Sequence, residues 1–217
     1  MRVQIVTFDG VEELDALAPL EVLGSAAALG FPIEVVLVAQ EPGRVKARYG
    51  AELIVNQALS PADADVVIVP GGGYANRAPR GTWAQIQHRT LPKALSDAVR
   101  AGLTLASVCS GAMLLSAAGV TNGRPCTTHH SARDDLVAAG GKWVDARVVD
   151  DGDLVTSGGV TSGLDLALWI LERDIGPVAA ATTEQFLEYE RRGTVWRAPR
   201  TARSHDQESD SELNGIS

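Results

Sequence analysis

One stretch of the chain, residues 103–115, constrains the fold more than any other. It reads LTLASVCSGAMLL, so an apolar run of strand type passes through the small residues Cys109-Ser110-Gly111 into a segment rich in Ala, Met and Leu. A strand that turns sharply into a helix exposes the turn residue at the carboxyl edge of a parallel sheet, where open α/β folds bind ligands. The stretch therefore predicts an α/β fold with a site at Cys109.

Similar apolar segments recur along the chain, and segments of helical type lie between them. We expect strands at 3–8, 32–38, 64–69 and 103–108, short strands near 45 and 53–55, and a hairpin joining 144–149 to 154–156. We expect helices at 12–29, 83–100 with a kink at Pro92, 110–118, 133–139, 160–173 and 177–189. Because the strands are apolar on both faces, a mostly parallel sheet with helices on both sides is predicted.

The domain organisation follows from length and composition. The 217 residues suffice for one α/β domain, which we place at residues 1–195. Residues 196–217 are polar and carry a local acidic cluster, which predicts a disordered tail. The chain has 19 basic and 27 acidic residues and a formal net charge of −8, which argues against a nucleic-acid-binding surface.

The location of the protein is also predicted from its sequence. The N-terminal apolar run meets Asp9 before a signal-type core could form, and no apolar run approaches the roughly 20 residues of a membrane span. Two cysteines are too few for a disulfide scaffold. We therefore expect a cytoplasmic protein that does not bind membranes.

Cys109 is the candidate nucleophile. The free N–H groups and partial positive charge at the start of the following helix would stabilise its thiolate, which is the reactive form. The alternative is a buried structural thiol, because free cysteines are among the most buried residues. A nucleophile also needs donors for the anion that develops on the substrate. The amide of Ser110 is one candidate, and the Gly71-Gly72-Gly73 loop after a buried strand is another, unless that loop is only a flexible turn.

Two other groups could act as acid or base. Asp15 lies among apolar residues just past the first strand and would face the same crevice as Cys109, although an N-cap role for the first helix is the favoured reading of its position alone. His129 and His130 follow the Cys109 helix, yet adjacent histidines on a loop are more often surface residues. No phosphate-binding glycine motif is present, and no residues have zinc-type spacing, so neither a nucleotide nor a metal is expected.

Several of these segments together resemble the ThiJ/PfpI superfamily, which is related to class I glutamine amidotransferases. The matching residues are Val69-Pro70-Gly71-Gly72, residues 106–112 (ASVCSGA), residues 117–120 (AAGV), Gly123-Arg124 and Thr127-Thr128-His129. Within the superfamily, Glu13-Leu14-Asp15 and residues 148–165 are most similar to the isonitrile hydratase branch. The resemblance covers residues 2–190 and implies a flavodoxin-like three-layer sandwich with a nucleophile elbow, usually a homodimer without a cofactor.

The resemblance also implies roles for individual residues. Cys109 would be the nucleophile and Asp15 its acid/base partner, with Gly72 in the anion-stabilising loop and Ser110 at the hydroxyl position after the nucleophile. The residues themselves add Gly71 to that loop and suggest His129 and His130 as neighbours of the site. The implied reaction is hydration of an isonitrile to an N-substituted formamide through a thioimidate on Cys109, which requires an Asp15 pKa raised toward the working pH.

The sequence departs from the family pattern at two positions. The hydratase branch has Thr at the position of Ser110 and an aromatic residue at that of His130, so the pocket is expected to differ. Alternatives are a glyoxalase-like or amidase-type cysteine enzyme of the same superfamily, although glyoxalase-type members carry Glu at the position of Asp15. A non-catalytic redox- or ligand-sensing domain is a further alternative.

Overall fold

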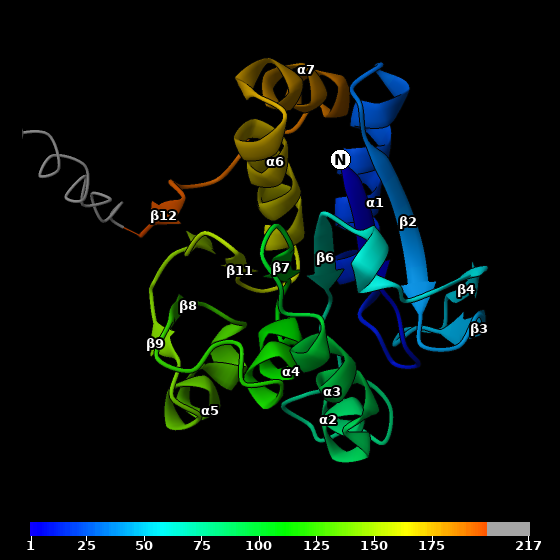
Figure 1. The fold of residues 1–217 in the computed structure, drawn as a ribbon, viewed down its shortest axis with the longest axis vertical. Coiled ribbons are helices and arrows are strands. Elements are labelled where there is room, and N and C mark those ends of the chain that lie inside the picture. The colour runs from blue at the N-terminus through cyan, green and yellow to red at the C-terminus, as the bar shows by residue number, and fades with distance from the viewer. Residues whose placement is uncertain (199–217) are drawn as a thin grey trace, which may run out of the picture.

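A sheet of eight strands organises the computed structural model, which describes residues 1–198 (Figure 1). In spatial order the strands are β12 (Trp196–Arg197), β10 (Val148–Asp150), β11 (Leu154–Ser157), β7 (Thr104–Ser107), β6 (Val66–Val69), β1 (Arg2–Val6), β2 (Glu34–Ala39) and β5 (Gln57–Ala58). All neighbours from β11 to β5 pair in parallel, whereas β10 forms the predicted antiparallel hairpin with β11. The expected mostly parallel sheet is therefore confirmed.

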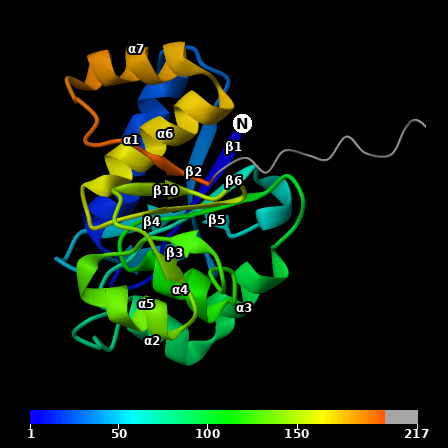
Figure 2. The same cartoon turned by 90° about the vertical axis from the view of Figure 1, so that its left-hand side faces the viewer.

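Two layers of helices cover the faces of this sheet, and Figure 2 shows one layer on each side. One layer contains α1 (Glu13–Ala28), α6 (Ser162–Asp174) and α7 (Pro177–Leu187). The other contains α2 (Thr82–His88), α3 (Thr90–Asp97), α4 (Gly111–Ala117) and α5 (Arg133–Ala138). The three-layer flavodoxin-like arrangement follows from strands that are apolar on both faces and must be covered twice.

The core lies on both sides of the central strands. Every residue of β6 is buried, and so are three of the four residues of β7. Small two-stranded sheets, β3 (Gly43–Lys46) with β4 (Glu52–Val55) and β8 (Pro125–Cys126) with β9 (Lys142–Trp143), lie beside the main sheet. Short 3₁₀ turns occupy Pro61–Asp63 and His130–Ala132.

Several boundaries differ from those expected from the sequence. The helix expected at 83–100 is two helices, and the chain turns at Arg89 with a positive φ of 63°. Pro92 does not kink a helix, because it lies in the first turn of α3, where its missing N–H has no helical partner to lose. The sheet also continues to Arg197 through the pairing of β12 with β10, two residues past the expected domain end. The rest of the tail, residues 199–217, lies outside the described residues.

Candidate active site

Cys109 occupies the turn between β7 and α4. Its φ is +59°, a left-handed conformation that non-glycine residues adopt at an energetic cost, and this strain is typical of a nucleophile elbow. Its N–H donates to the carbonyl oxygens of Gly158 (2.9 Å) and Ser157 (3.2 Å), which hold the turn against the end of β11. The elbow thus lies at the carboxyl edge of the sheet, as the sequence predicts.

The thiol of Cys109 is almost completely buried, with 7% of the residue exposed. The pKa of Cys109 is raised to about 12. Burial is the largest cause, and the charge of the nearby Asp15 carboxylate is the second. The backbone N–H groups of Val160 and Ser110 hydrogen-bond the sulfur and lower its pKa, but they do not outweigh burial. The expectation that the helix N-terminus would leave a resting thiolate is therefore wrong, because α4 is short and its start is shielded from water.

Asp15 lies in the first turn of α1 and is fully buried. Its Oδ2 accepts the N–H of Gly71 (3.0 Å), while Oδ1 has no hydrogen-bond partner among residues 1–198. Burial raises the pKa of Asp15 to about 7, partly opposed by the hydrogen bond from Gly71 and by interaction with the Cys109 thiol. The N-cap position belongs to Glu12, so the capping role considered for Asp15 is wrong.

The glycine loop after β6 is closely packed and is not a flexible turn. A Cβ on Gly71 would lie 2.5 Å from Ser110 Oγ, and a Cβ on Gly72 would lie 2.5 Å from the carbonyl oxygen of Gly10. The N–H of Gly72 donates to Ser110 Oγ (3.1 Å), and that hydroxyl lies 3.4 Å from Thr82 Oγ1. In this structure the Gly71 and Gly72 donors are therefore engaged by Asp15 and Ser110 and are not directed at a substrate.

A buried ion pair next to Asp15 was not found from the sequence. The Glu12 carboxylate is buried and binds Arg48 Nη1 at 2.7 Å, while the Glu12 N–H donates to the carbonyl oxygen of Gly71 (2.9 Å). Its negative charge raises the pKa of Asp15 further, and the Arg48 cation lowers it. Only the fold reveals this pair, because Arg48 comes from the loop between β3 and β4, 36 residues away from Glu12.

Val160 was also missed, although the Gly158-Gly159 pair before it marks a tight loop. Its N–H contacts the Cys109 sulfur, and its φ of +30° is unusual for a β-branched residue. With the Ser110 N–H, it forms a pair of backbone donors at the sulfur. Donors were also expected from the glycine loop, but the N–H groups of Gly71 and Gly72 bind Asp15 and Ser110 instead.

The two histidines have different surroundings. His129 is half-buried against Gly159, and its Nδ1 accepts the N–H of Ser131 (3.2 Å) and contacts the Ser131 hydroxyl (2.8 Å). Burial, followed by His130 and Arg48, lowers the pKa of His129, which favours its neutral form. His130 is exposed, and neither histidine hydrogen-bonds Cys109 or Asp15. Cys126 is a fully buried free thiol whose pKa burial raises to about 11.

The described residues 1–198 offer little for other kinds of site. They hold no group of three or more His, Cys, Asp or Glu side chains close enough to share a metal ion. Within the same range, no helix combines the length and apolar character needed to cross a bilayer.

Comparisons with known proteins find similar sequences and similar structures. The model of the DJ-1/PfpI family matches residues 1–173. An isonitrile hydratase of Pseudomonas putida is 33% identical over 190 residues, which cover 87% of this chain and 78% of the relative. A deglycase of Pyrococcus horikoshii is 31% identical, covering 79% of this chain and 96% of the relative. The crystal structure of a ThiJ/PfpI family protein from Pseudomonas syringae superposes with a TM-score of 0.78 at 28% identity, covering 88% of this chain and 76% of that one.

Proposed function

The chain belongs to the DJ-1/PfpI family, and from that premise we propose that it adds water to an isonitrile, R–N≡C, to give the formamide R–NH–CHO. The observation that carries the proposal is the buried pair of Cys109 and Asp15. Burial raises the pKa of Asp15 to about 7, so the carboxyl group can both accept and return a proton at neutral pH. The isonitrile hydratase among its relatives, 33% identical, supports this choice of reaction.

In the first step the thiol adds to the terminal carbon of the isonitrile. Because the pKa of Cys109 is about 12, the thiol needs a base, and the ionised form of Asp15 is placed to take its proton. Sulfur forms a bond to carbon as Asp15 passes the proton to that same carbon. The product is a thioimidate, R–N=CH–S–Cys109, and Asp15 is again ionised.

In the second step water attacks the thioimidate carbon. Asp15 removes a proton from the water and passes it to the nitrogen, which gives R–NH–CH(OH)–S–Cys109 and leaves Asp15 ionised. The C–S bond then breaks, the hydroxyl proton returns through Asp15 to the sulfur, and R–NH–CHO leaves. The unpartnered Oδ1 of Asp15 is the atom that would move these protons, because Oδ2 is held by Gly71.

The roles of the remaining site residues follow from their contacts. Val160 and Ser110 donate to sulfur and would favour its anionic form during attack and departure. Ser110 and Gly72 would fix the glycine loop, and Gly71 would fix Asp15. His129 and His130 would line the entrance without moving protons.

We include a homodimer in the proposal, since family members commonly dimerise, and sedimentation equilibrium would test it against the 22.8 kDa monomer mass. The two free thiols suit the reducing cytoplasm predicted from the sequence.

The test is turnover of a panel of simple isonitriles by three variants. Cys109→Ala and Asp15→Asn should each lower kcat/KM by at least about a thousandfold, because each removes a group that acts in the bond-forming step. Cys126→Ala is the matched control, because it removes the other buried thiol and should retain turnover. Unchanged turnover in Cys109→Ala or Asp15→Asn would contradict the mechanism.

A second candidate reaction is favoured by the deglycase among the relatives. The same thiol and carboxyl group could act on an α-oxoaldehyde as in glyoxalase-type chemistry. Loss of methylglyoxal, measured beside loss of isonitrile with the same enzyme preparation, separates the two. Turnover of methylglyoxal alone would select this candidate.

A further inference from the structure

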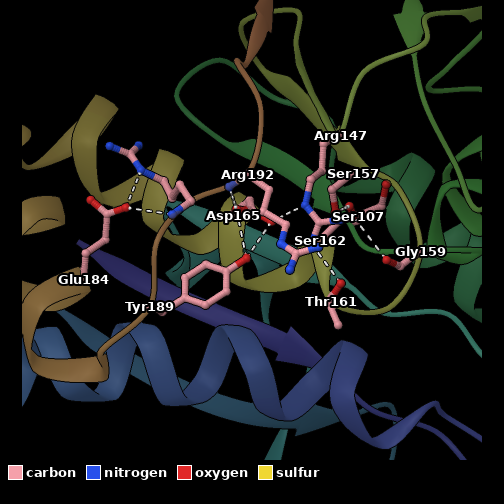
Figure 3. Close-up of polar contacts among 11 residues, drawn as sticks. Ser107, Arg147, Ser157, Gly159, Thr161, Ser162, Asp165, Glu184, Tyr189 and Arg192 are labelled. Atoms are coloured by element: carbon pink, nitrogen blue, oxygen red, sulfur yellow. Dashed lines mark hydrogen bonds and ion pairs between the residues drawn. The ribbon is translucent and has the colours of Figure 1, made fainter.

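Asp165, in the first turn of α6, connects that helix with two distant parts of the chain, one at Arg147 and one at residues 189–192. The residue is 2% exposed, and its carboxylate binds the Arg147 guanidinium, the Tyr189 hydroxyl (3.1 Å to each oxygen) and the Arg192 N–H (2.8 Å). Figure 3 shows these groups converging on Asp165. A buried carboxylate with this many donors fixes the position of each of them.

Arg147 carries this connection toward the active site. Its Nη2 donates to Thr161 Oγ1 (2.8 Å) (Figure 3). Its carbonyl oxygen accepts the N–H of Gly158 (3.0 Å). Gly158 and Thr161 bound the loop between β11 and α6. Arg147 therefore holds both ends of a four-residue loop, residues 158–161, and is itself held by Asp165.

The same loop contacts the nucleophile twice. The carbonyl oxygen of Gly158 accepts the Cys109 N–H at 2.9 Å, and the Val160 N–H faces the Cys109 sulfur. Val160 has a φ of +30°, a conformation that a β-branched residue keeps only when its surroundings hold it there. The ties that Arg147 makes on either side of Val160 supply such a restraint.

We propose that Arg147 and Asp165 are positioning residues for Cys109, and that their ion pair holds loop 158–161 so that the Val160 N–H stays directed at the sulfur. Neither residue touches the thiol. This inference depends on the proposed function only in that the reaction uses Cys109 as a nucleophile. It makes its own prediction about the thiol, which is independent of the substrate.

Other charged groups act on the same thiol and must be kept constant. Asp15 faces the sulfur from α1, and Arg48 approaches from the loop between β3 and β4. His129 packs against Gly159 on the loop itself, and burial lowers its pKa. None of these residues binds Arg147 or Asp165, so substitutions in the ion pair leave them in place.

The experiment measures the rate of Cys109 alkylation by iodoacetamide from pH 6 to pH 10 in the whole protein, with mass spectrometry of the modified peptide. Cys126 is fully buried and serves as the internal reference thiol. Asp165→Asn and Arg147→Ala should raise the pKa of Cys109 by about half a unit. Because that pKa lies above the measured range, the change appears as alkylation that is about threefold slower at each pH. Arg147→Lys should recover part of this change, because it keeps the charge beside Asp165.

Glu172→Gln is the matched control. Glu172 is also on α6 and also binds the C-terminal segment, through Arg191 Nη1 at 2.6 Å, but it contacts neither Arg147 nor the loop. It should lower the melting temperature without moving the alkylation profile. If Asp165→Asn and Arg147→Ala lower the melting temperature while their profiles coincide with that of the wild type, the positioning role is wrong. Failure of the wild type to hydrate isonitriles would instead contradict the proposed function and leave this comparison intact.

Discussion

The properties of Asp15 come from its immediate neighbours. Burial is the largest cause of its raised pKa, and the Glu12 carboxylate three residues earlier adds to it. The Glu12 carboxylate is in turn bound by Arg48 at 2.7 Å. The pKa of the acid/base group is therefore moved toward neutral pH mainly by burial, and the neighbouring carboxylate adds to the shift.

This arrangement predicts the effect of Glu12→Gln on the pH dependence of kcat/KM for isonitrile hydration. The thiol proton must pass to ionised Asp15, so the rate rises with pH through the pKa of Asp15. Without the Glu12 charge, and with Arg48 freed to act on Asp15, that pKa falls and the rising limb moves to lower pH by about half a unit. Glu13→Gln, on the same turn but bonded to the Tyr49 N–H, is the control. A rising limb that stays in place or moves to higher pH would refute this account.

At the scale of elements, the junction of β6, β7 and α4 allows almost no extra volume. The N–H of Val108 donates to the Val69 carbonyl oxygen (3.0 Å), and that same oxygen lies against the Cα of Gly111 at the start of α4. A side chain on Gly111 would overlap this oxygen and the Pro70 carbonyl group. The elbow thus depends on a close approach between a helix start and the end of a neighbouring strand.

Two glycine substitutions test this packing by their free energies of unfolding. Gly111→Ala should destabilise the protein by about 3 kcal/mol, because the new methyl group forces the helix away from β6. Gly24→Ala, within α1, meets no atom within 4 Å and should stabilise the protein by about 0.5–1 kcal/mol through helix propensity. Urea denaturation measures both. Equal midpoints for Gly111→Ala and the wild type would show that the junction is looser than described.

At the scale of the whole molecule, burial of Asp15 couples the reaction to stability. The folded protein keeps a proton on Asp15 up to about pH 7, whereas the unfolded chain releases it near pH 3.8. Between these values the folded state binds more protons than the unfolded state, so this residue favours folding at low pH and its contribution is lost as pH rises to 7. Asp15 thus makes the protein less stable at the pH at which it would work.

Asp15→Asn should therefore gain stability relative to the wild type as pH increases. The difference in unfolding free energy should grow from pH 4 to pH 8 by up to about 4 kcal/mol, at 1.4 kcal/mol for each unit of pKa difference. Urea denaturation at several pH values measures it, with Asp97→Asn as the control for loss of an exposed carboxylate. A difference that is constant with pH would show that Asp15 is ionised to the same extent in both states.

The sequence by itself determined the sheet, its two helical layers and the position of Cys109 at a strand–helix turn. These features follow from local patterns, since apolar runs of strand length and helical periodicity decide which segments are buried. The tertiary structure alone decided the protonation of Cys109, the engagement of Gly71 and Gly72 by Asp15 and Ser110, and the contacts of Arg48, Val160 and Asp165. Desolvation and hydrogen bonding depend on groups that are distant in the chain, so no local pattern carries that information.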